Sequence, residues 1–206
     1  MSDPWARLRA ARDAQYAGPV DMTPRPASAS QTEITTVMQI FDANNDGNVH
    51  GGTIMRLVDE ATGIAAARHC RRRVVTASMD DMSFLAPVYI GDLVSVRAMV
   101  NDAHRTSMEV GARVDVQSIA ANDDWRPVAS AHLVFVALDA DGRPTAVPPV
   151  LAEGPDQERR QAQARVRREQ RLLRKRALAD AAAGSDGAGR AEAQPRHAPP
   201  PVQSTS

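Results

Sequence analysis

The residues whose types and spacing could carry chemistry are concentrated between Asp42 and Thr53, in the sequence DANNDGNVHGGT. One interpretation is a calcium-binding loop of the EF-hand type, because D-x-N-x-D-G places oxygen ligands at the required offsets. The other is a polar turn followed by the start of a helix, where unpaired backbone N–H groups and the helix dipole attract negative charge. The first predicts a metal site, and the second predicts an enzyme that stabilises a developing oxyanion.

The calcium interpretation lacks its strongest ligand. A loop that begins at Asp42 needs a bidentate Glu at its twelfth position, which is Thr53 in this chain. The preceding residues, ITTVMQIF, have the β-branched content of a strand instead of a helix, and no second loop is present to pair with the first. We therefore expect no metal site in this segment.

A helix that begins after Gly51 and Gly52 would carry an acid, Asp59, about two turns inside. Its helical neighbours are small and mainly apolar, so a carboxylate there would be partly desolvated and would suit a general base. The alternatives are an ion pair with Arg56 on the preceding turn, or simple exposure at the helix edge. The glycines are equally typical of an ordinary loop-to-helix junction, with Asn44 as a turn or capping residue and His50 as a plausible cap or packing residue.

These residues need a scaffold of strands around the helix. The helix expected over 53–69 carries apolar residues, Ile64 among them, on more than one face, which indicates a buried helix. Residues 104–118 alternate with the period of a half-buried strand, with Glu109, Arg113 and Asp115 on the polar side. The order strand, helix, four strands predicts an α+β domain in which a mostly antiparallel sheet curls around one central helix. The expected strands are 31–41, 71–85, 88–100 with a bend at Gly91-Asp92, 104–118 and 128–139.

The composition divides the chain into four parts. Residues 1–30 are polar and lack a sustained period, so we expect a disordered or extended arm before a domain at 31–152. Residues 153–180 predict a basic helical extension, with nine Arg or Lys residues between 157 and 178. Residues 181–206 have the composition of a disordered tail.

The composition also excludes several classes of protein. Net charge is zero, and the single cysteine, Cys70, excludes an intrachain disulfide. No window approaches the roughly 18 apolar residues of a membrane span, and the N-terminus lacks an apolar signal core. These features predict a cytoplasmic protein with no membrane contact. The basic helix has no interleaved aromatic residues for base stacking, so we expect no specific nucleic-acid partner.

Several motifs, in the right order, carry a resemblance to a known family. They are NxxGNVHGGTIMxLxDEA from Asn44, then AAxRHC, VTASMD, FLAPVxIGD and TSMEV. Over about residues 32–150 the chain resembles the acyl-CoA thioesterases of the hotdog fold, most closely the cytosolic long-chain acyl-CoA hydrolases and their bacterial single-domain relatives. The resemblance implies a single hotdog domain that hydrolyses fatty acyl-CoA to free fatty acid and CoA without a metal or organic cofactor.

The resemblance also implies roles for individual residues. Asn44 and Asp59 match the catalytic pair, and the N–H of Gly52 is our choice of oxyanion donor. In the family the two catalytic residues come from opposite domains, so a homodimer would form two complete sites, commonly assembled further into a trimer of dimers. Asp59 would either activate water or attack the thioester directly. The candidates for contact with CoA are Gly51, Arg105, Thr106 and Ser107. The alternative interpretation is that Gly51 belongs to a plain helix start and the other three to an ordinary turn.

Two other functions compete with hydrolysis. Hotdog dehydratases and hydratases use a His/Asp or His/Glu pattern that is absent here. A non-catalytic acyl-CoA-binding module, with the basic helix contacting RNA or an acidic partner, is the alternative of a different class. We favour the thioester hydrolase, with the C-terminal helix packed on the surface of an oligomer.

Overall fold

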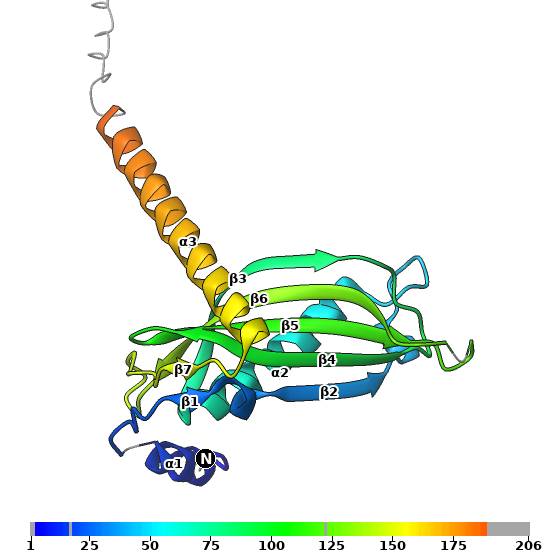
Figure 1. Ribbon diagram of the computed structural model, residues 1–206, viewed down its shortest axis with the longest axis horizontal. Helices are drawn as coiled ribbons and strands as arrows, with labels where there is room; N and C mark the ends of the chain where they lie inside the picture. Colours follow the sequence, from blue (N-terminus) through cyan, green and yellow to red (C-terminus); the bar gives the residue numbers. More distant parts are fainter. Residues whose placement is uncertain (1–2, 17, 122, 189–206) are drawn as a thin grey trace, which may run out of the picture. The chain divides into compact units, whose positions relative to one another are not determined.

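The computed structural model describes residues 3–16, 18–121 and 123–188 (Figure 1). The chain forms two compact units, Met1–Val166 and Arg167–Ser206, and each is described by itself. α3 (Pro155–Ala188) begins in the first unit and continues in the second. The other elements are α1 Ala6–Gln15, β1 Arg25–Pro26, η1 Ala27–Ser30, β2 Thr32–Val37, η2 Ile40–Asp42, α2 Gly51–Cys70, β3 Arg73–Phe84, β4 Leu93–Ala103, β5 Ser107–Gln117, β6 Arg126–Leu138 and β7 Val150–Leu151.

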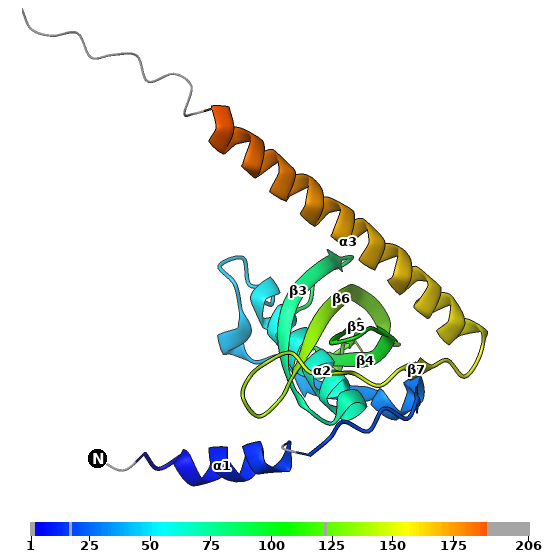
Figure 2. The ribbon, with the colours of Figure 1, turned by 90° about the vertical axis from the view of Figure 1, so that its left-hand side faces the viewer.

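Five of the strands form one sheet in the order β2-β4-β5-β6-β3. All four neighbouring pairs are antiparallel, and the sheet curls around α2 (Figure 2). The predicted α+β layout, with one central helix against an antiparallel sheet, is therefore confirmed. β3 is an edge strand of 12 residues, and no other strand among the described residues pairs with its outer side.

Two of the strands are shorter than the sequence predicted. The first ends at Val37, and the residues that follow form the short 3-10 turn η2. The strand expected over 88–100 begins only at Leu93. Gly91, with φ of 88°, and Asp92 belong to a tight turn, in which the Asp92 carboxylate accepts a hydrogen bond from the Tyr89 N–H (2.9 Å).

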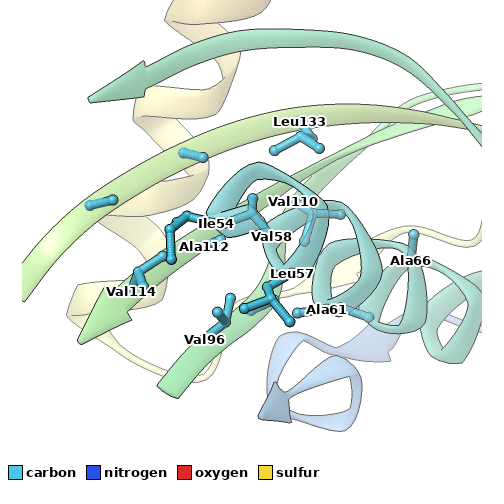
Figure 3. Close-up of a cluster of buried hydrophobic side chains, with 14 of the residues drawn as sticks. Ile54, Leu57, Val58, Ala61, Ala66, Val96, Val110, Ala112, Val114 and Leu133 are labelled. Atoms are coloured by element: carbon cyan, nitrogen blue, oxygen red, sulfur yellow. The ribbon is translucent and has the colours of Figure 1, made fainter. Parts of the chain in front are cut away.

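α2 begins two residues earlier than predicted and packs one face into the core (Figure 3). The buried residues recur at helical spacing, and they meet the inward-facing valines of β4 and β5. The prediction of a helix buried on nearly all sides is wrong, because Ile64 and Met55 are 42% and 41% exposed. The labelled core residues are Ile54, Leu57, Val58, Ala61, Ala66, Val96, Val110, Ala112, Val114 and Leu133.

The polar side of β5 is more buried than its sequence suggested. Asp115 is 1% exposed, because Arg97 and Arg113 fold over it and form salt bridges with its carboxylate. Glu109 is 3% exposed and accepts a hydrogen bond from the side-chain amide of Asn101 (3.1 Å). The alternation of apolar and polar residues correctly predicted the strand, but two of the three polar residues do not face solvent.

The segment before the sheet is more ordered than the predicted arm. α1 is helical, β1 pairs in parallel with β7, and η1 buries Ala27 and Ser30. The Ser30 hydroxyl accepts a hydrogen bond from the Val100 N–H (2.9 Å) on β4. Residues 25–30, which the sequence placed in the arm, therefore pack as part of the domain.

The predicted C-terminal helix is present as α3 and continues to Ala188, eight residues into the predicted disordered tail. Its first turns pack on the domain, where Ala164 is 1% exposed and Gln161 donates a hydrogen bond to the buried Asp102 carboxylate (3.0 Å). The rest of the predicted tail, 189–206, lies outside the described residues. Within the described part of the chain, no helix combines the length and the apolar character that crossing a membrane requires.

Candidate active site

Asn44 lies in a tight turn directly before α2. Its side-chain carbonyl oxygen accepts hydrogen bonds from the N–H groups of Asp46 (2.9 Å) and Asn48 (3.1 Å). Gly47 completes the turn with φ of 81°, a conformation that favours glycine. The turn fixes the orientation of the Asn44 side chain and leaves its NH₂ group as the donor for an external acceptor.

The loop is anchored on a buried carboxylate. Asp42 is 8% exposed, and its side chain accepts a hydrogen bond from the Gln39 N–H (2.8 Å). Its backbone carbonyl accepts from the His50 N–H (2.7 Å), which connects the beginning and the end of the loop. Among the described residues, no three His, Cys, Asp or Glu side chains lie together in a way that could hold a metal ion.

The start of α2 is capped by the side chain of His50, as the sequence allows. The Gly52 N–H donates a hydrogen bond to Nδ1 of His50 (2.8 Å), which makes His50 the N-cap residue. Our predicted oxyanion donor is therefore already paired in this structure. Gly51 lies against the ring of Phe84, so a Cβ at Gly51 would be 3.6 Å from that ring.

Asp59 points away from the core and is exposed in the single chain. The predicted partial burial is therefore absent in the single chain, and the alternative of exposure at the helix edge is observed. The alternative ion pair with Arg56 is also absent, since Arg56 binds Glu60 at 2.8 Å. Asp59 instead accepts a hydrogen bond from the hydroxyl of Thr76 on β3, at 2.7 Å.

Thr76 is the site residue that the sequence analysis missed. It pairs with the inward-facing Phe135 of β6, so its side chain points to the α2 side of the sheet. The motif VTASMD contained it, but nothing in one sequence connects a strand threonine to an acid 17 positions earlier. Together, Asp59 and Thr76 form a hydrogen-bonded carboxylate on the exposed side of α2. Met55, one turn before Asp59 on the same face of the helix, is an exposed apolar side chain.

The predicted CoA contacts at 105–107 lie elsewhere in the chain. They form the hairpin between β4 and β5, whereas the Asn44 turn adjoins the opposite end of the sheet, where β4 begins (Figure 1). The carbonyl groups of Arg105 and Thr106 each accept a hydrogen bond of 3.1 Å, from the N–H groups of Val147 and Ala137. One chain therefore does not bring this hairpin to Asn44.

Asp59 and the start of α2 are also separated within one chain. Asp59 follows Gly51 by eight positions in the helix, which corresponds to about 12 Å along the axis. A carbonyl group bound at the helix start is therefore beyond the reach of the same chain's Asp59. The predicted site residues are present, but one chain holds them in two places.

Comparison with known sequences gives consistent matches. The family description "Thioesterase superfamily" matches residues 46–120. An uncharacterised acyl-CoA thioester hydrolase of Bacillus subtilis is 36% identical over 133 residues, which are 64% of this chain and 77% of that protein. The cytosolic acyl coenzyme A thioester hydrolase of Rattus norvegicus is 34% identical over 138 residues, 66% of this chain but only 36% of the rat protein.

Solved structures show the same likeness. An acyl-CoA hydrolase of Staphylococcus aureus in complex with butyryl coenzyme A and coenzyme A has 31% identity, covers 79% of this chain and 98% of its own, and has a TM-score of 0.71. An apo-hexameric acyl-CoA thioesterase has 30% identity, coverages of 74% and 97%, and a TM-score of 0.71. The Staphylococcus enzyme has also been solved with an Asn, an Asp or a Thr replaced by Ala. Those three residues are separated by 15 and 17 positions, as are Asn44, Asp59 and Thr76.

Proposed function

Because this chain belongs to the acyl-CoA thioester hydrolases of the thioesterase superfamily, we propose that it hydrolyses fatty acyl-CoA with Asp59, Asn44 and the start of α2 as its catalytic groups. The activity resides in residues 31–152, together with the segment 25–30 that packs on them. The hydrogen bond from Thr76 to Asp59 is the observation that carries the assignment of these residues. It holds a carboxylate in one orientation on an open surface, and both residues keep the spacing of the positions replaced in the Staphylococcus enzyme.

We infer that a complete site needs two chains. The separation of about 12 Å between the start of α2 and Asp59 is too large for one chain to contact both sides of a thioester. Within the described residues, no strand pairs with the outer edge of β3 beside Asp59, and an open edge of this length is a template for pairing with another strand. A second copy that pairs there would bring its own Asn44 turn and helix start toward this Asp59.

The same arrangement supports larger assemblies. Some of the solved structures that resemble this chain are hexameric acyl-CoA thioesterases. We propose a dimer formed across β3, assembled further as a trimer of dimers. In such an assembly, Gly51 and the hairpin of Arg105, Thr106 and Ser107 can serve the CoA moiety of a site on a neighbouring chain, with the arginine facing phosphate.

The reaction follows from these positions. Asp59 takes a proton from a water molecule while the water oxygen attacks the thioester carbonyl carbon, and the carbonyl electrons move onto oxygen. The NH₂ group of Asn44 and the N–H groups at the start of α2 stabilise that oxyanion. Collapse of the intermediate re-forms the C=O bond and breaks the C–S bond. The CoA sulfur takes the proton that Asp59 received from water, and CoA leaves as the thiol. Direct attack by Asp59 would pass through an anhydride and requires the same groups.

We propose that the reaction takes place in the cytoplasm. The rat relative is described as cytosolic, and the reaction as written consumes only water and acyl-CoA.

Release of free CoA thiol from a panel of acyl-CoA substrates tests the proposal. Asp59→Ala should lower kcat by about 100- to 10,000-fold, the usual contribution of a general base. Asn44→Ala should lower it by about 100-fold, the usual cost of one oxyanion donor. Glu60→Ala is the matched control, because Glu60 is the adjacent carboxylate but is paired with Arg56, and it should keep wild-type activity. Full activity of a folded Asp59→Ala protein would exclude this mechanism.

Mixing the two inactive variants tests the shared site. If Asn44 and Asp59 come from opposite chains, a mixed dimer of Asn44→Ala and Asp59→Ala contains one intact site. Random exchange of subunits should then restore about one quarter of wild-type activity. No recovery after proven subunit exchange would place both residues in a site within one chain.

A further inference from the structure

His50 covers the end of α2 at which the thioester oxygen is expected to bind. Its Nδ1 accepts the hydrogen bond of the Gly52 N–H at 2.8 Å. A Cβ at Gly52 would lie 2.8 Å from Nδ1 and 3.0 Å from Cε1, so the imidazole lies directly over that residue. The absence of a side chain at Gly52 is therefore what allows the ring to reach the helix start.

The backbone of His50 is fixed, whereas its ring is free to turn. The backbone N–H donates to the Asp42 carbonyl (2.7 Å), and the carbonyl accepts from the Thr53 N–H (2.9 Å). The side chain is exposed, and the bond to Gly52 is its one hydrogen bond within the described part of the chain. Rotation about the side-chain bonds can therefore move the imidazole away without disturbing the loop or the helix.

The Gly52 N–H cannot serve both an imidazole and a thioester oxygen at full strength. We propose that His50 is a positioning residue that occupies the oxyanion position in the free enzyme and is displaced by the carbonyl oxygen of the substrate. The inference rests on the proposed function, because it identifies the start of α2 with the oxyanion donor.

The exchange has a direction that suits catalysis. A neutral carbonyl oxygen replaces a neutral ring nitrogen, so binding of the substrate gains little from this position. The developing oxyanion is charged and accepts a stronger hydrogen bond than the imidazole does. The N–H group therefore favours the transition state over the bound substrate, which is what accelerates a reaction.

Two substrate analogues separate this role from ordinary helix capping. An S-(2-oxoalkyl)-CoA ketone presents a carbonyl group that a CH₂ group separates from sulfur, so it has no thioester bond to hydrolyse. The S-alkyl-CoA thioether of equal length presents no carbonyl group. Calorimetry should show that His50→Ala binds the ketone about 2- to 10-fold more tightly than wild type does, the equivalent of one hydrogen bond no longer displaced. Binding of the thioether should not change. His50→Asn keeps a capping acceptor and should behave like wild type.

The results distinguish this inference from the proposed function. If wild type hydrolyses acyl-CoA but His50→Ala binds both analogues as wild type does and only melts earlier, His50 is a structural cap and the inference is wrong. If wild type hydrolyses no acyl-CoA, both proposals are wrong. If His50→Ala fails to fold, ¹⁵N NMR spectra of the wild type test whether the substrate carbonyl displaces His50. The His50 Nδ1 signal, assigned by its loss in His50→Asn, must shift with the ketone and not with the thioether.

Discussion

Replacement of Thr76 by valine removes one hydroxyl group and keeps the shape of the side chain. The lost interaction is the 2.7 Å hydrogen bond to the Asp59 carboxylate. A hydrogen bond to a charged group contributes about 1.5–3 kcal/mol. If the bond serves the transition state, the loss corresponds to a roughly 10- to 150-fold lower kcat, since about 1.4 kcal/mol is a factor of ten. KM should change little, because Thr76 positions Asp59 and contacts it instead of the acyl-CoA.

Thiol release under saturating acyl-CoA measures kcat, and thermal unfolding in the same preparation measures stability. Thr76 is exposed on the edge strand, and valine suits a strand, so the melting temperature should stay within a few degrees of wild type. Thr76→Ser retains the hydroxyl and should recover most of the activity. Thr35→Val, an exposed threonine on the opposite edge strand β2, is the matched control. A Thr76→Val enzyme with wild-type kcat, or a Thr76→Ser enzyme as impaired as Thr76→Val, would refute the reasoning.

Three further predictions concern the scaffold. Burial lowers the pKa of His69 from 6.5, so as the pH falls the imidazole is protonated in the unfolded chain before it is protonated in the folded chain. The melting temperature should therefore fall as the pH drops from 7.5 to 5.5, with a smaller slope in His69→Gln. Gly111→Ala places a Cβ 2.7 Å from the amide nitrogen of buried Asn101 and should cost about 1–3 kcal/mol in denaturant unfolding. Deletion of 167–206 should leave hydrolysis and melting unchanged, whereas deletion of 155–206 should lower the melting temperature by about 3 °C per kcal/mol of lost packing.

The layout of the fold was predictable because its signals are local. The two-residue period of β5 and the apolar spacing in α2 each indicate an element within a short window of sequence. Burial of the polar side of β5 was not predictable, because it depends on partners from β4. A carboxylate such as Asp115 normally indicates solvent, and only the folded sheet brings Arg97 next to it.

The candidate site was predictable in part for the same reason. Asn44, Asp59 and the glycines stand in one continuous motif, so their types could be read together with the resemblance. Their surroundings could not be read. Thr76 meets Asp59 only because β3 lies beside α2 in the folded chain, and the exposure of Asp59 depends on where the sheet ends. The sequence allowed His50 to cap α2, but only the folded chain shows that its Nδ1 atom accepts the hydrogen bond of the Gly52 N–H.

In the proposed dimer, the single helix α2 contributes groups to two active sites. In the dimer we propose, the first turn of α2 serves one substrate and Asp59, eight residues later, serves the other. A helix is stiff over two turns. A tilt that brings the first turn of α2 closer to one thioester therefore also moves the Asp59 carboxylate beside the second thioester. The two centres are therefore expected to communicate, and occupancy of one should alter the turnover of the other even when the substrates never touch.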